Sequence, residues 1–194
     1  MISLRAAVRT RVALIRPGAT EFDEQGRFKG SLDMPLSELG RDQADQLAHE
    51  MASLHLDAIY SAPCQSALQT ADRLCRDREL KPKTIDALRN VDHGLWHGKL
   101  IEEIRRNQPR LYRSLCDAPD SFCPPGGETI DEARSRADKA VRRILRRRRN
   151  EVVALVVPDP LASLISSELG EEPLAKAWSM ATDAGHWQLI DALT

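Results

Sequence analysis

The chain has few aromatic residues and no long apolar run. Aromatic side chains make up only 4% of its 194 residues, so each tryptophan should contribute strongly to packing, and we expect Trp96, Trp178 and Trp187 in or near the core. No apolar run is long enough to span a bilayer, and the amino-terminal residues lack the apolar region of a secretory signal. We therefore expect a cytoplasmic protein that makes no membrane contacts.

Cysteine is also scarce, and the charge is nearly balanced. The chain has four cysteines, Cys64, Cys75, Cys116 and Cys123, and none forms a Cys-x-x-Cys pair. This spacing argues against a zinc or redox motif and is too sparse for a disulfide framework, so we expect buried or half-buried free thiols. A net charge of −1 gives no overall preference for nucleic acid.

Apolar segments alternate with helical patterns along the chain. The apolar runs predict strands at 11–15, 57–61, 83–88, 151–157 and 186–191. Helical spacing predicts helices at about 37–54, 63–75, 129–149 and 160–168, with helical pieces over 99–116 that break at Pro109. This alternation implies an α/β fold, and without repeats or a linker we expect one domain over 1–194.

The first predicted strand ends in a tight turn, and the interpretation of the rest of the chain depends on this stretch. Residues 12–20 read VALIRPGAT, which predicts a buried strand that ends at Arg16-Pro17-Gly18. In α/β proteins, ligands bind at the carboxyl ends of such strands. The loop that follows, 17–36, is long for a compact domain, and loops of this length are usually functional.

Further motifs follow this turn in order. They are Asp33-Met34-Pro35-Leu36, Gly40-Arg41-Asp42-Gln43-Ala44, Tyr60-Ser61-Ala62-Pro63 running on to Gln69-Thr70-Ala71, Leu88 to Gly98 with Gly94 and Trp96, and Pro125-Gly126-Gly127-Glu128-Thr129. Together with the turn they resemble the histidine phosphatase (phosphoglycerate-mutase-like) superfamily over about residues 12–170. The resemblance implies a three-layer α/β/α fold with a central, mostly parallel sheet.

The resemblance also implies phosphoryl transfer, for which this chain lacks the family's groups. In the family a histidine accepts the phosphoryl group, arginines and a second histidine hold its oxygens, and a carboxylic acid protonates the leaving oxygen. By that likeness, Pro17 replaces the nucleophilic histidine, Ser66 replaces an arginine and Asn90 replaces the acid. Pro158 and Asp159 stand in the turn where the family has Ser-His-Gly.

These substitutions predict a catalytically inactive pseudoenzyme with a binding or regulatory role. Arg16 remains from the charged pocket, and Arg27 is a second candidate contact for an anion. We expect no cofactor and no metal, and a small anion or a protein as the unidentified partner, with a homodimer as one arrangement. One alternative stays open at this site, a phosphatase or mutase-type enzyme that combines Arg16 with Cys64, His93 or Asp159.

A second alternative is weak polyanion binding through the basic run Arg142–Arg149. The simpler interpretation is a solvated helix end, where cations are favoured by the helix dipole, and the absence of interleaved aromatic residues argues against nucleic acid. Simpler interpretations also exist for Cys64, as a packing residue, and for His93 and His97. The two histidines lie four apart but are interrupted by glycine, which favours a surface or loop-packing role over a metal site. His186 is interpreted as structural.

Overall fold

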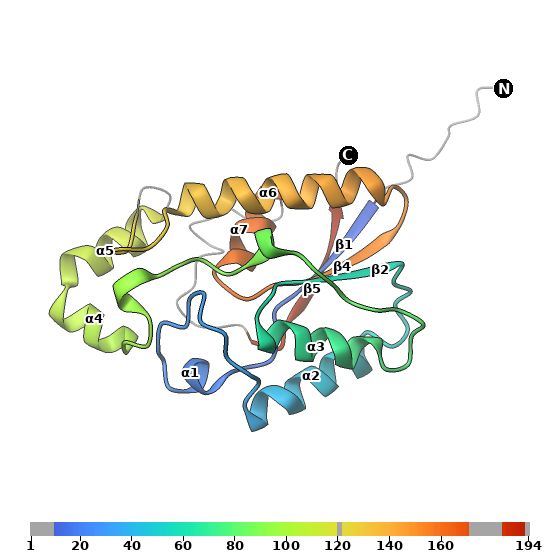
Figure 1. The fold of residues 1–194 in the computed structure, drawn as a ribbon, viewed down its shortest axis with the longest axis horizontal. Helices are drawn as coiled ribbons and strands as arrows, with labels where there is room; N and C mark the ends of the chain where they lie inside the picture. Colours follow the sequence, from blue (N-terminus) through green and yellow to red (C-terminus); the bar gives the residue numbers. More distant parts are fainter. Residues whose placement is uncertain (1–9, 120–121, 171–183, 193–194) are drawn as a thin grey trace.

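A single five-stranded sheet forms the centre of the protein (Figure 1). The structure is a computed structural model that describes residues 10–119, 122–170 and 184–192. The strands are β1 (Thr10–Ile15), β2 (Ala58–Ser61), β3 (Lys83–Thr84), β4 (Val152–Val156) and β5 (Trp187–Ala192), in the order β3-β2-β4-β1-β5. All neighbouring pairs are parallel except β1 and β5, which are antiparallel.

Helices cover both faces of this sheet. Figure 1 shows α2 (Glu38–Glu50) and α3 (Gln65–Cys75) on one face, with α6 (Ile130–Arg147) and α7 (Leu161–Glu168) on the other. The shorter elements are α1 (Glu21–Glu24), α4 (Ile101–Asn107), α5 (Pro109–Asp117), η1 (Asp86–Leu88) and η2 (Gly94–Trp96). The expected α/β architecture with a central, mostly parallel sheet flanked by helices is confirmed.

Local sequence signals explain why α6 and β4 form. In α6 the hydroxyl of Thr129 accepts a hydrogen bond from the Glu132 amide, and the Glu132 carboxylate accepts one from the Thr129 amide, which closes a capping box. In β4 every residue is buried, as expected for a parallel strand covered on both faces. Because β4 lies between β1 and β2, its carboxyl end lies beside those of both neighbours.

Several elements differ from the sequence prediction. The strand expected at 83–88 is only Lys83–Thr84, because these residues lie exposed at the sheet edge and the chain then turns into η1. The long loop 17–36 contains the short helix α1, whose first turn is closed by a capping box between Thr20 and Asp23. Among the described residues, no helix is long and apolar enough to cross a membrane.

The scarce residues divide between core and surface. Trp96 is buried in a small second core with Phe28 and Phe122, and Trp187 is partly buried against the main core, while Trp178 lies outside the described residues. All four cysteines are free. Cys64 and Cys75 are half-buried as expected, but Cys116 and Cys123 are exposed, because they lie on and after the outlying helix α5.

Candidate active site

Arg16 and Asp159 meet where β1 and β4 end. Ile15 and Val156 are register partners at the carboxyl ends of these parallel strands, so the residues that follow them emerge at the same edge. Arg16 Nε donates to a carboxylate oxygen of Asp159 at 2.5 Å, and Arg16 Nη2 donates to Ser163 Oγ at 3.2 Å. Arg16 is only 6% exposed, so the edge carries a shielded guanidinium whose charge is balanced by one carboxylate.

Asp159 is held by the helix that follows it. Its second carboxylate oxygen accepts from the Ser163 amide at 3.1 Å and from the Ser163 hydroxyl at 2.8 Å. Ser163 lies in the first turn of α7, where amide groups lack partners within the helix. Asp159 therefore stabilises the start of α7 and orients Arg16 at the same time. Ser163 was not among the residues predicted for the site, although its four-residue spacing from Asp159 at a helix start is a signal for such a contact.

Asn90 connects three segments of the same edge. Its amide nitrogen donates to the carbonyl oxygens of Gly30 at 3.0 Å and Asp159 at 2.6 Å, and its amide oxygen accepts from the Leu161 amide at 3.3 Å. The residue is 4% exposed. The resemblance implies a catalytic acid at this position. The structure instead has a side-chain amide whose nitrogen and oxygen both make hydrogen bonds, which connect the loop at Gly30 to the start of α7.

Two histidines lie on the other side of Gly30. A side chain at Gly30 would meet His97 Nε2 at 2.4 Å and His93 Nδ1 at 3.0 Å, and its φ of +54° is also unfavourable for other residues. His97 Nε2 accepts from the His93 and Ser31 amides at 3.2 and 3.3 Å. Within the described residues, no group of His, Cys, Asp or Glu side chains has the arrangement of a metal site.

His93 is a buried, neutral imidazole. Burial, together with the neighbouring His97, lowers the pKa of His93 to about 4, although Asp92 opposes the shift. Its Nδ1 is buried and has no hydrogen-bond partner among the residues that the structure describes. The expected loop-packing role is confirmed, because the ring packs edge-on against Phe28.

The remaining sequence candidates lie around this cluster rather than in it. Pro17 continues the turn, and its carbonyl accepts from the Gly185 amide at 2.9 Å. Ser66 is buried near the start of α3, with Oγ 3.6 Å from Cys64 Sγ. Pro158 lies in the turn after β4, and its carbonyl accepts from the Ala162 amide at 3.1 Å, at the start of α7.

Arg27 makes its contacts outside the Arg16 cluster. Its Nη1 donates to the carbonyl of Gly98 at 2.6 Å, its Nε donates to Gln25, and the guanidinium stacks over Phe22. Cys64 contacts Ser66, and no described contact joins it to a histidine that could act as its base. Of the combination considered for an enzyme, the structure thus brings together Arg16 and Asp159, with His93 nearby across Gly30.

The chain is similar to known proteins over most of its length. The model of the histidine phosphatase superfamily (branch 1) matches residues 12–192. Phosphoserine phosphatase 1 of Hydrogenobacter thermophilus is 31% identical over 181 residues, which are 93% of this chain and 85% of that protein. A glucosyl-3-phosphoglycerate phosphatase of Mycolicibacterium vanbaalenii is 35% identical over 120 residues, 61% of this chain and 52% of that protein.

Solved structures agree with this result. A mycobacterial glucosyl-3-phosphoglycerate phosphatase in complex with VO3 has a TM-score of 0.82 and 26% identity, covering 93% of this chain and 92% of the other. The expectation of a catalytically inactive protein is therefore wrong, because relatives that match nearly the whole chain are named phosphatases. A replaced side chain does not by itself remove activity, because other groups can lie at the same edge of the sheet.

Proposed function

Because the chain belongs to the histidine phosphatase superfamily, we propose that it hydrolyses phosphate monoesters of small molecules with a reorganised set of groups. The names of its relatives, phosphoserine phosphatase and glucosyl-3-phosphoglycerate phosphatase, share one chemical class, a phosphate ester on a small polar alcohol. The observation that carries the proposal is the shielded Arg16 guanidinium at the carboxyl edge of the sheet. A cytoplasmic location, expected from the sequence, is part of the same proposal.

In this proposal Arg16 binds the phosphoryl oxygens. Its planar guanidinium presents several donors in one plane, which suits a phosphate as well as a carboxylate. A substrate phosphate exchanges with the Asp159 carboxylate, which Ser163 holds in place through the amide and hydroxyl contacts at 3.1 and 2.8 Å. The positive charge of Arg16 then stabilises charge that develops on the phosphoryl oxygens in the transition state.

Asp159 is the proposed proton acceptor. A water molecule attacks phosphorus and gives its proton to the Asp159 carboxylate, while the bond from phosphorus to the ester oxygen breaks. The leaving alkoxide takes a proton from solvent, so the products are an alcohol and inorganic phosphate. Pro17 has an amide nitrogen with no lone pair to offer, so this route forms no phosphohistidine at position 17.

The test is phosphate release by the purified full chain from p-nitrophenyl phosphate and L-phosphoserine. We expect turnover that falls by about 100-fold or more in Arg16→Met and in Asp159→Asn, as for the loss of a group that acts in the transition state. The matched control is Arg105→Met, which removes an exposed arginine of α4 and should leave the rate unchanged. Absence of turnover above the background, or full activity in Arg16→Met, would overturn the proposal.

Acid- and alkali-quenched trapping of labelled phosphate separates the direct route from a covalent one. The proposed route accumulates no phosphoenzyme at any pH. An alkali-stable phosphohistidine that disappears in His93→Gln would instead make the free Nδ1 of His93 the nucleophile and would exclude direct attack by water.

A further inference from the structure

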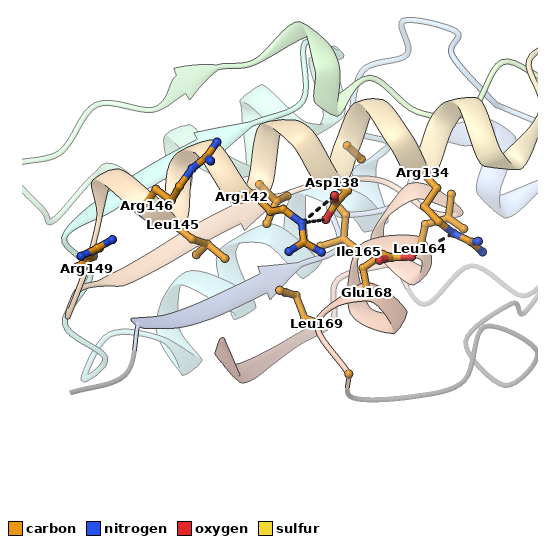
Figure 2. Close-up of a pocket in the computed structure, with 13 residues that line it drawn as sticks. Arg134, Asp138, Arg142, Leu145, Arg146, Arg149, Leu164, Ile165, Glu168 and Leu169 are labelled. Carbon is orange, nitrogen blue, oxygen red and sulfur yellow. Dashed lines mark hydrogen bonds and ion pairs between the residues drawn. The ribbon is translucent and has the colours of Figure 1, made fainter. Parts of the chain in front are cut away.

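A hollow of about 570 Å³ lies between α6 and α7 (Figure 2). We call it the α6–α7 hollow; its lining shares no residue with the Arg16 cluster. Its volume falls within the range of about 300–1,000 Å³ that is typical of small-molecule sites. Three arginines of the basic run at the end of α6 line it, namely Arg142, Arg146 and Arg149.

The floor of the hollow is apolar. Ala137, Val141 and Leu145 are spaced four apart and so form one stripe along α6, and α7 contributes Leu164 and Ile165. These side chains belong to the main core and are nearly buried. A ligand that uses this floor must therefore present an apolar body.

The rim is charged, and its charges are unevenly paired. Arg142 Nε donates to the Asp138 carboxylate at 2.7 Å, and Arg134 pairs with Glu168 at 3.3 Å. Arg146 and Arg149 also line the hollow, and within the described residues neither has an acidic partner. Figure 2 shows Arg149 at the far end of the hollow from Glu168, with Arg146 about one turn of α6 closer along the helix.

The helix dipole alone does not explain this arrangement. The carboxyl end of a helix favours cations, but that preference applies equally to Arg143 and Arg147, which do not line the hollow. The basic run is also not one continuous patch, because Arg148 turns to Glu151 and the Tyr60 hydroxyl. A second copy related by a two-fold axis at this rim is disfavoured as an occupant, since its own Arg146 and Arg149 would face the same charges.

We propose that the α6–α7 hollow binds a small anionic amphiphile. Its apolar chain lies on the stripe formed by Val141 and Leu145, and its carboxylate or phosphate head group lies between Arg146 and Arg149. Guanidinium groups bind both head groups through the same fork of donors, so the shared requirement is one anionic group on an apolar chain. This site is independent of the phosphatase proposal, because it requires no reaction at Arg16.

The experiment measures binding of decanoate and decyl phosphate to the full chain by calorimetry, below the concentrations at which either forms micelles. We expect saturable binding of one molecule, and much weaker binding of decanol, which has the chain without the charge. In the double variant Arg146→Gln/Arg149→Gln the Kd should rise by about ten-fold, as for two partly exposed charge contacts. The matched control Arg143→Gln/Arg147→Gln removes the same charge from the same turns and should change the Kd by less than about two-fold.

Four results would overturn the proposal. Equal losses in the two double variants would show a general effect of surface charge. Competition by inorganic phosphate as strong as that by decanoate would show a simple anion site without a role for the apolar floor. Binding to anionic lipid vesicles without binding of the monomeric amphiphiles would show a membrane surface instead. Leu169 also lines the hollow, so a carboxylate introduced there by Leu169→Glu should weaken decanoate binding, and unchanged affinity in this variant would also overturn the proposal.

Discussion

Replacing Asn90 by alanine tests whether its hydrogen bonds hold the candidate site together. The side chain is 4% exposed and makes three hydrogen bonds, to the carbonyls of Gly30 and Asp159 and from the amide of Leu161. Both polar atoms of the side chain make hydrogen bonds, so its removal leaves three backbone groups without their partner. Asn90→Ala should therefore destabilise the fold and loosen the turn that holds Asp159.

The magnitude follows from what the substitution leaves behind. A buried polar group without a partner costs about 1–3 kcal/mol, and three such groups remain, although entering water lowers the total. We expect a loss of about 3–5 kcal/mol in the free energy of unfolding. For a chain of this length that corresponds to a fall in Tm on the order of 10 °C.

Urea denaturation with fluorescence detection measures the change. The control is Asn107→Ala, an exposed residue at the end of α4, which should stay within about 0.5 kcal/mol of the parent. Asn90→Asp preserves the shape but replaces two donors by a carboxylate facing two carbonyls, so it should be at least as destabilising as alanine. If both Asn90 variants stay within about 1 kcal/mol of the parent, the three hydrogen bonds do not hold this edge together and the reasoning is wrong.

Two further predictions concern charged and titratable groups. Arg16→Met should lower the free energy of unfolding by about 3 kcal/mol, because it leaves the Asp159 carboxylate, 14% exposed, without its cation. The double variant Arg16→Met/Asp159→Leu should recover part of that loss. If the effects of the two single substitutions on the free energy of unfolding simply add, the two side chains are not coupled. The pKa of His93 is lowered from 6.5 to about 4, so the unfolded chain binds the proton more readily than the folded chain does. The free energy of unfolding should therefore be highest above about pH 6.5 and fall by about 3 kcal/mol toward pH 4. His93→Phe should remove that part of the pH dependence in denaturation curves, and the exposed control His55→Gln should retain it.

The sequence predicted the secondary structure well where the signals are local. The apolar run that became β4 and the stripe and cap of α6 depend on neighbours within a few residues, so periodicity and capping chemistry suffice to find them. The strand expected at 83–88 was predicted too long, because a local pattern does not show how far a segment pairs with its neighbour. Whether an apolar segment pairs over its whole length depends on the neighbouring strand, and β2 offers pairing only to Lys83 and Thr84.

Function was less accessible to the same reasoning. Position-by-position likeness identified Pro17, Ser66 and Asn90 as departures, and the conclusion of inactivity was wrong once relatives named as phosphatases matched most of the chain. A substitution viewed alone shows only what one side chain cannot do. It does not show which other groups reach the same space. The spacing of His93 in the sequence also did not show that its ring is buried and neutral, with an Nδ1 that has no partner among the described residues.

The sequence by itself determined that Arg16 follows a buried strand at the ligand-binding edge of an α/β sheet, because a strand and its turn are encoded by adjacent residues. Only the tertiary structure decided what Arg16 faces. The pairing of β1 with β4 brings together Arg16 and Asp159, which lie 143 positions apart, and α7 then presents Ser163 to both. That placement depends on the register of two strands and the docking of a helix, which are set by the packing of the whole core.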